Sequence, residues 1–502
     1  MISSEKRYTE KRRMRLVTPV SNIRKLRSAS ISHPEILIDF IVLILSIFSK
    51  KIGIPIAVEI PTDGVDSEQD PRIHSTIQYL QDFGIISHVR QERRQFDDEP
   101  FFYGVIAEIS GRKRMGYSGY GKSLTSPVSA SWAALGEALE RWALDHYEPK
   151  ENECIQVTTH ALKSKYAIDL FKVAGFSPKT RAQENQDRNY NVSQDTTFTC
   201  VKVKNVLSKG DTLAPLQWFS FLHAAHATDR RIEPIISPIT SNGAATGVDF
   251  NDAVYRGMLE VIERDAFMVH WMNGIVPSRI NLGSLNSEVV LLVKRIAEKY
   301  QLAIHLLYLK TDFPVHVVQA VVVDKTGVGP AVLCDSACGT DIDVCIERAV
   351  LGALGLRPHI RKQLEKKLIK VPSEISKLTM ETRALWWATS DKIASISDYL
   401  SGPYITTKDM AHYGRMYKDT NLSILCDELR QKRYTCIAKM ISPAHVQKNT
   451  NLVTVMVKIP ELQPLHFNEW EVCDFGHRLD DIPKLLKLTK KCDVGNLPHP
   501  YA

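Results

Sequence analysis

The sequence lacks an apolar run long enough to cross a bilayer. The run from Ile36 to Phe48 spans 13 residues and contains Asp39, whereas a membrane-spanning helix needs about 20 apolar residues. Pro34 and Glu35 precede the run and are typical of a helix start, which favours a short buried or interfacial helix. The preceding basic stretch is too long for a signal-peptide n-region, and no small-residue cleavage site follows it. We therefore predict a cytoplasmic protein without a membrane span.

A cysteine pattern of the kind found in disulfide-rich or zinc-binding domains is also lacking. The nine cysteines are odd in number and scattered along the chain, unlike the framework of a small secreted domain. Cys334, Cys338 and Cys345 lack the two-residue gap of a zinc pair, and no second pair accompanies His223 and His226. We expect these five residues to lie in the core and the thiols to stay reduced.

The body of the chain has no surplus of positive charge. The formal net charge is +7, from 64 Lys and Arg against 57 Asp and Glu, but residues 1–30 hold nine bases and two acids, which leaves 55 of each in the rest. A groove that follows a polyphosphate backbone needs a basic surplus in the body itself. We predict a flexible basic arm over 1–30, a region over 31–75 that contains the short apolar helix, and a main domain over 76–502. We expect no nucleic-acid partner, and nucleic-acid binding through the arm is the alternative.

The remaining composition is that of a folded protein, with 44% hydrophobic residues in a chain of 502. Such a length can bury a large core. β-rich runs alternate with helical segments, and this pattern predicts an α+β fold with mixed β-sheets packed against helices. The expected strands are Phe102–Ile109, Leu302–Tyr308, His316–Val323 and Leu452–Val457.

Three helices have clear start signals, because short polar N-cap residues or an early proline precede each of them. Thr340 and Asp343 have the spacing of a capping box before the third helix. The first helix is expected from Pro127, after Ser126, to about Tyr147, the second from Asp249 and Asp252 to about Met272, and the third from Asp341 to Leu356, where Pro358 ends it.

The segment Gly116–Ser123 matches the Walker A expression, with two glycines followed by Lys122 and Ser123. A working P-loop needs a buried strand immediately before the glycines and the Lys-Ser pair in the first helical turn. Here a polar turn precedes the glycines, and the helix cap comes three residues later at Ser126. We therefore predict a β-hairpin with a glycine-rich exit.

A Glu-x-x-Glu-Arg motif occurs twice, once in each of the first two helices. The motif residues are Glu137, Glu140 and Arg141 in the first helix and Glu260, Glu263 and Arg264 in the second. Glutamates three residues apart share one helix face. Because apolar residues flank them, these carboxylates are expected to be partly buried, where they need cations for compensation, and hard oxygen ligands suit Mg²⁺. Glutamates paired with their own arginines at a surface are the alternative.

In these features the sequence resembles the YcaO superfamily of ATP-dependent enzymes that modify peptide backbones. The resemblance covers roughly residues 76–502. It rests on Tyr120-Gly-Lys-Ser before the first motif helix, Ser241-Asn-Gly-Ala-Ala-Thr-Gly before the second, Ile346-Glu-Arg348-Ala in the third helix, and Leu497-Pro-His-Pro-Tyr-Ala. It implies a YcaO-type ATP-binding fold that is not a P-loop fold, with ATP and Mg²⁺ as cofactors.

The resemblance also implies roles for individual residues. The metal ligands would be the four glutamates of the two motifs, and the nucleotide would be bound by Asp252, Arg264, Arg348 and Arg141. The azoline-forming branch tends to place a proline-rich tail in the active site, which here would be Pro498, His499 and Pro500, with His499 as a candidate proton carrier near neutral pH. A frayed chain end is the alternative for this tail.

Three positions depart from the family pattern. Ala133 stands where the family usually has Ser, Val248 stands where it often has Asn, and Gly352 stands where a glutamate usually completes the metal cage four residues after Arg348. A lost carboxylate can be replaced by water, because Mg²⁺ normally keeps several water ligands.

The function that the resemblance implies is ATP-dependent cyclodehydration of Cys, Ser or Thr residues in a ribosomally made precursor peptide, such as a bacteriocin precursor, to thiazolines or oxazolines. The expected partners are the precursor peptide, a separate leader-peptide-binding protein and a flavin-dependent dehydrogenase. The alternatives are a thioamide-forming YcaO enzyme and a non-catalytic YcaO-like scaffold, the latter because of the three departures.

Overall fold

The computed structural model describes residues 70–501 apart from 93–94, 112–115, 177–189, 231, 286, 368, 413–418 and 475. The expected basic arm over 1–30 and the apolar helix at Ile36–Phe48 therefore lie outside the described residues. In the described part of the chain, no helix has both the length and the apolarity needed to cross a membrane. The predicted domain start at residue 76 falls inside helix α3, Pro71–Asp82.

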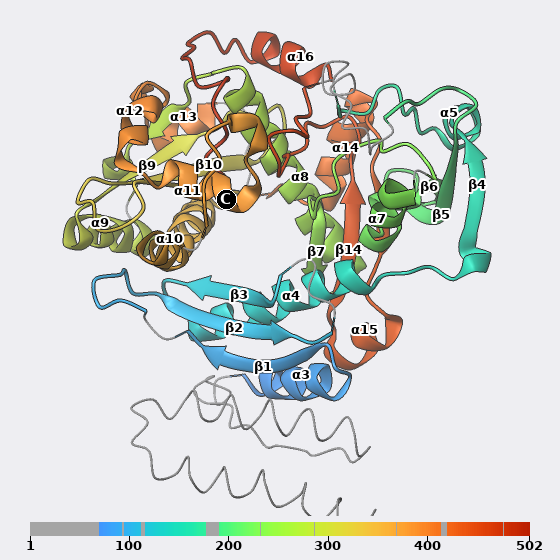
Figure 1. Cartoon of the computed structure of the whole chain (residues 1–502), viewed down its shortest axis with the longest axis horizontal. Helices are drawn as coiled ribbons and strands as arrows, with labels where there is room; N and C mark the ends of the chain where they lie inside the picture. Colours follow the sequence, from blue (N-terminus) through green and yellow to red (C-terminus); the bar gives the residue numbers. More distant parts are fainter. Residues whose placement is uncertain are drawn as a thin grey trace, which may run out of the picture. The chain divides into compact units, whose positions relative to one another are not determined.

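The described strands form three sheets (Figure 1). The first is an antiparallel sheet of β1 (Ile86–Gln91), β2 (Tyr103–Ile109) and β3 (Ser118–Ser123). In spatial order, the second contains β11 (Val332–Gly339), β10 (His316–Asp324), β9 (Leu302–Tyr308), β8 (Ser278–Ile280) and β12 (Tyr404–Ile405). The third contains β4 (Cys154–Thr158), β5 (Thr197–Asn205), β13 (Ile437–Met440), β14 (Val453–Lys458) and β7 (Ala244–Gly247), with β6 (Asp211–Pro215) beside β5. The four expected strands are confirmed to within one residue at each end, and so is the α+β class.

The sequence of strand β10 is almost continuously apolar because the strand is buried on both faces. It pairs with β9 on one side and β11 on the other. Val317, Val321 and Val323 belong to one buried cluster and Val318 and Val322 to another. Because both faces of the strand are covered, the alternation of apolar and polar residues that marks a half-exposed strand is absent.

Three long helices each contact two of the three sheets, and they are the helices that the sequence predicts. Helix α4 (Pro127–His146) packs on β2 and β3 and also contacts β7; α8 (Phe250–Met272) contacts β7, β14 and β11; α10 (Ile342–Lys366) packs on β10 and β11 and also contacts β3. Helix α4 therefore links the first and third sheets, α8 links the second and third, and α10 links the first and second. The three helices converge between the sheets.

The helix starts follow local hydrogen bonding. The side chain of Ser126 accepts from the backbone N–H of Ser129 at 3.1 Å, and Asp249 accepts from Asp252 at 2.9 Å. The predicted N-cap at Ser126 is thus confirmed, and Asp249 is the N-cap of the second helix. The third helix differs from the prediction, because Asp341 rather than Thr340 is the N-cap.

The expected end of the third helix at Pro358 is wrong, since α10 continues through this residue to Lys366. Proline removes one backbone hydrogen bond and disfavours a helix interior. Buried ion pairs flank the proline and compensate for this loss. Arg357 binds Asp324 at 2.6 Å, and Arg361 binds Glu99 at 3.2 Å.

The glycine-rich segment forms strand β3 of a hairpin with β2, as predicted, and not a phosphate-binding loop. Its glycines allow α4 to approach the strand closely. A Cβ atom at Gly119 would lie 2.8 Å from the Cα of Ala138, and one at Gly121 would lie 2.9 Å from the carbonyl carbon of Ala130. Both distances are too short for packed atoms, so glycine is required here for helix–strand packing.

The other described helices lie around this framework. They are α5 (Thr159–Tyr166), α7 (Phe221–Arg230), α9 (Glu288–Tyr300), α11 (Met380–Trp387), α12 (Ile393–Ile396), α13 (Thr407–His412), α14 (Leu422–Lys432), α15 (Ala444–Thr450) and α16 (Arg478–Leu485).

Candidate active site

A cleft of about 790 Å³ lies where α4, α8 and α10 converge, and five of the predicted acidic residues line it. Arg348 of α10 is on its wall as well. Helices that are far apart in sequence therefore bring their acidic faces to one space. The five acidic residues are Glu137, Glu140, Asp252, Glu260 and Glu263.

The first glutamates of the two motifs are held in the same way. Glu137 accepts a hydrogen bond from the backbone N–H of Tyr120 at 2.8 Å, and Glu260 accepts one from the backbone N–H of Gly243 at 2.9 Å. Each donor lies 17 residues before its glutamate. These bonds fix one oxygen of each carboxylate by a charge-assisted contact.

Only one of the three predicted phosphate-binding arginines lines the cleft. Arg348 lines the cleft. Arg141 and Arg264 are not among the cleft-lining residues and instead bind the glutamates. Arg141 contacts Glu137 at 2.5 Å, and Arg264 contacts both glutamates of its motif, at 3.3 Å and 2.9 Å. In the structure the two motif arginines thus compensate carboxylate charge.

The second glutamates of the two motifs, Glu140 and Glu263, are affected by burial more than the first glutamates. Glu263 is 7% exposed and accepts hydrogen bonds from the hydroxyl groups of Ser336 at 3.0 Å and Tyr501 at 3.1 Å. Burial raises the pKa of Glu263 to about 7. The pKa of Glu140 is also raised, by burial and then by the charges of Glu260 and Glu137.

These carboxylates fit Mg²⁺. The raised pKa values of Glu140 and Glu263 mean that the folded protein without cations holds the negative charge of these two side chains unfavourably, and a divalent cation would relieve this. Carboxylate oxygens on a wall open to water are the ligands that Mg²⁺ prefers, because it retains several waters. The alternative, in which glutamates pair only with their own arginines, accounts for Glu137, Glu260 and Glu263 but not for Glu140.

Two charged side chains from strands, Lys122 and Asp335, also interact electrostatically with residues of the two motifs. Lys122 of β3 belongs to the glycine-rich segment, and its pKa is lowered by burial although Asp335 and Glu137 oppose the shift. The pKa of Asp335, on β11, is raised to about 6 by burial, against the opposing charges of Arg264 and Lys122. Sequence reasoning missed Asp335, because nothing distinguishes a single acid within an apolar strand.

Comparison with known proteins identifies the family. The profile described as YcaO cyclodehydratase, ATP- and Mg²⁺-binding, matches residues 119–463, more than half of the chain. The chain belongs to the YcaO cyclodehydratase family. The resemblance seen in the sequence is thus confirmed, and the expected ATP and Mg²⁺ are the cofactors of this family. A search of curated proteins found no significant match.

Solved structures share the YcaO fold. A heterocyclase in complex with substrate and cofactor matches with a TM-score of 0.63 and 17% identity over 85% of this chain and 57% of that one. The heterocyclase TruD matches with a TM-score of 0.54 and 17% identity over the same shares. YcaO from Methanopyrus kandleri, bound with AMPPCP and Mg²⁺, matches with a TM-score of 0.51 and 16% identity over 80% of this chain and 94% of that one. This chain therefore matches little more than half the length of the two heterocyclases.

Two of the three departures from the YcaO pattern lie on the cleft wall. Ala133 and Val248 both line the cleft. The backbone N–H of Val248 donates to Asp252 at 3.0 Å, and the same oxygen of Asp252 accepts from Arg256 at 2.9 Å. Arg256, half exposed, is a cleft cation that sequence reasoning missed.

The segment around the two tail prolines is packed against other described parts of the chain, so the alternative of a frayed end is wrong. Pro498, His499 and Pro500 are buried. The indole N–H of Trp387 donates to the carbonyl of Pro498 at 2.9 Å. None of the three predicted tail residues is among those that line the cleft. The tail residue that reaches the site is Tyr501, through its hydrogen bond with Glu263.

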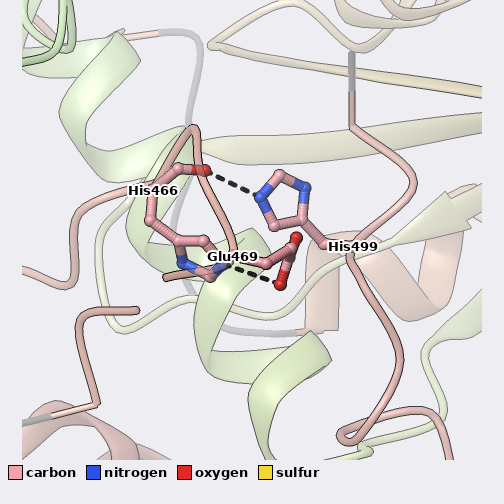
Figure 2. Close-up of side chains that lie close together, drawn as sticks. All are labelled: His466, Glu469 and His499. Atoms are coloured by element: carbon pink, nitrogen blue, oxygen red, sulfur yellow. Dashed lines mark hydrogen bonds and ion pairs between the residues drawn. The ribbon is translucent and has the colours of Figure 1, made fainter. Parts of the chain in front are cut away.

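His499 lies in a buried cluster with His466 and Glu469, shown in Figure 2. Its Nε2 atom is 2.9 Å from the carbonyl oxygen of His466, and burial lowers its pKa well below the ordinary value. A histidine in this state is neutral near pH 7, which does not support the predicted proton carrier. Glu469 is bound to buried Arg383 at 3.1 Å, so a metal ion here would compete with a guanidinium. The cluster anchors the tail.

All nine cysteines are free thiols, and Cys334, Cys338 and Cys345 are buried as expected. His223 lies 3.1 Å from Glu233, and the side chain of His226 lies outside the described residues.

Proposed function

We propose that this protein catalyses ATP-dependent cyclodehydration of Cys, Ser or Thr residues in a ribosomally made precursor peptide. In this reaction the side-chain sulfur or oxygen loses its proton and attacks the preceding backbone carbonyl, and the resulting oxyanion takes the γ-phosphoryl group of ATP with ADP as the leaving group. Phosphate and the proton of the amide nitrogen are then lost as the C=N bond of the thiazoline or oxazoline forms. An amide oxygen is a poor leaving group, and phosphorylation corrects this.

The observation that supports the proposal is the arrangement of four motif glutamates around one cleft in a YcaO cyclodehydratase. Glu137, Glu140, Glu260 and Glu263 would hold Mg²⁺, which supplies charge stabilisation for the triphosphate when bound. Arg348, on the same wall, would contact phosphate oxygens as a bidentate donor.

Other residues orient this group. Arg141 and Arg264, bound to the motif glutamates, set the rotamers of the carboxylates rather than contacting phosphate. Asp252, held by the backbone of Val248, adds an acidic residue to the cleft wall. We assign the role of tail contact to Tyr501 in place of the three predicted tail residues, since its hydroxyl reaches Glu263.

The partners proposed are the precursor peptide, a separate leader-peptide-binding protein and, for oxidation of the rings, a flavin-dependent dehydrogenase, all in the cytoplasm. Support for an assembly comes from a similar structure, the E. coli microcin synthetase McbBCD complex with pro-MccB17 bound, which matches with a TM-score of 0.50 and 12% identity over 74% of this chain and 88% of that one.

The test combines nucleotide binding with product mass. The protein and a Glu263→Gln variant are titrated calorimetrically with MgATP and incubated with candidate precursor peptides. The proposal expects binding that the variant weakens and a product that has lost one water per ring. Replacement of oxygen by sulfur in the presence of sulfide would instead support the thioamide alternative. Absence of MgATP binding, together with no effect of the variant, would support the scaffold.

A further inference from the structure

A carboxylate from a strand fills the space that Gly352 leaves open on α10. A Cβ atom at position 352 would overlap the Oδ2 and Cγ atoms of Asp335 and would lie 2.7 Å from its Cβ. Two side chains cannot occupy this volume together. A side chain at position 352 would therefore collide with Asp335, and glycine is the residue that fits there. Position 352 is also where the YcaO family usually has a glutamate.

A second glycine on the same helix face repeats the arrangement. A Cβ atom at Gly355 would lie 2.8 Å from the Cδ of Lys122. Glycine inside a helix is destabilising by roughly 1 kcal/mol relative to alanine. Both glycines of α10 thus make room for charged side chains, Asp335 from β11 and Lys122 from β3, close to Arg348 on the preceding turn.

Asp335 is not among the residues that line the cleft, but its carboxylate interacts with the charges of the motif residues beside it. Its Oδ1 accepts from the backbone N–H of Ser336 at 2.8 Å, and this bond fixes the rotamer so that Oδ2 lies over Gly352. Asp335 interacts electrostatically with Arg264, Lys122 and Glu137. Glu263 in turn experiences the charge of Asp335. Asp335 therefore belongs electrostatically to the group of motif glutamates.

We propose that Asp335 supplies the carboxylate of the Mg²⁺–nucleotide site that position 352 does not, so that the acid has moved from the helix to the neighbouring strand. This proposal rests on the proposed function, because it assigns a residue to the same site. It removes the main reason for regarding the protein as a scaffold, since the cage then keeps its number of carboxylates.

The test returns a carboxylate from position 335 on β11 to position 352 on α10. We compare the full-length protein with Asp335→Asn, Gly352→Glu and the double variant Asp335→Gly/Gly352→Glu, and use Glu365→Gln as a matched control, because this exposed acid of α10 lies outside the cleft. Binding of AMPPCP is measured by calorimetry at increasing Mg²⁺ and, separately, in EDTA. Circular dichroism reports folding.

Asp335→Asn is expected to weaken the Mg²⁺-supported binding roughly 10- to 100-fold while binding in EDTA stays the same. Gly352→Glu alone is expected to bind poorly because of the overlap, and the double variant is expected to recover most of the loss. Equal losses with and without Mg²⁺ would mean that Asp335 only neutralises Lys122 and Arg264, and would overturn the proposal. If Asp335→Asn does not fold, the double variant decides, since failure to bind in a folded double variant refutes the relocation.

The two proposals fail in different ways. If the unaltered protein does not bind AMPPCP with Mg²⁺, the proposed function is wrong. If it binds and Asp335→Asn binds equally well, only the role of Asp335 is wrong.

Discussion

The hydroxyl of Tyr501 donates a hydrogen bond of 3.1 Å to Glu263, the most buried of the cleft glutamates. The tyrosine ring also stacks with the guanidinium of Arg264 at 4.3 Å. Its carbonyl oxygen accepts two hydrogen bonds from buried Arg383, at 3.2 Å and 3.1 Å. Tyr501 therefore connects the tail segment directly to the carboxylate of Glu263 in the candidate site.

Replacing Tyr501 with Phe tests this link, because the ring remains and only the hydroxyl is lost. A hydrogen bond to a charged group contributes about 1.5–3 kcal/mol, and we expect a decrease of that order in the free energy of unfolding, measured by urea denaturation. ATP turnover should also fall, since Glu263 loses a partner that fixes its rotamer. Tyr404→Phe serves as the control, because Tyr404 is an exposed residue whose hydroxyl accepts only a long hydrogen bond of 3.4 Å from Arg279. Equal stability of both variants would contradict the link.

Glu137→Gln and Glu260→Gln should each abolish ATP turnover while the protein stays folded. Each change removes the charge of a proposed Mg²⁺ ligand but keeps the side-chain oxygen that accepts from the backbone. The loss should be about 100-fold or more, because it removes several kcal/mol of charge stabilisation. Phosphate release measures turnover, and Glu288→Gln, at an exposed position of α9, is the control. Normal turnover in either variant would exclude a shared metal site.

The raised pKa of Glu263 predicts how stability depends on pH. Burial raises this pKa from 4.5 to about 7. Between these values the folded protein keeps a proton that the unfolded chain releases, so the contribution of Glu263 to the free energy of unfolding falls as pH rises. Glu263→Gln does not titrate. Without Mg²⁺, the variant should therefore gain stability relative to the unaltered protein as pH rises from about 4.5 to about 7, as measured by urea denaturation, and a constant difference would refute the assignment.

Gly121→Ala should destabilise the fold, because the new methyl group would overlap the backbone of Ala130 in α4. We expect a loss of about 1–3 kcal/mol, typical of overpacking, and a lower midpoint of thermal unfolding. The matched control is Gly136→Ala in α4, where the nearest atom would lie 3.8 Å away, so stability should be unchanged or improved. Equal effects would argue against a packing role for the glycine-rich strand.

Much of the fold follows from local sequence signals. The start of α4 at Ser126 and Pro127 and the strand Leu302–Tyr308 could be predicted because capping and β-propensity act within a few residues. The end of α10 could not, because ion pairs made by Arg357 with distant segments keep the helix intact beyond Pro358. Tertiary contacts of this kind outweigh the local preference of proline.

The sequence by itself determined the two Glu-x-x-Glu-Arg helices, the acidic face of each, and the family to which the chain belongs, since helical periodicity and motif spacing are local properties. Only the tertiary structure decided that Arg264 binds glutamates instead of lining the cleft, that Tyr501 and not His499 contacts the site, and that Asp335 occupies the space above Gly352. The reason is that helices and strands distant in sequence define these positions, and the direction of a side chain between packed elements depends on all of them together.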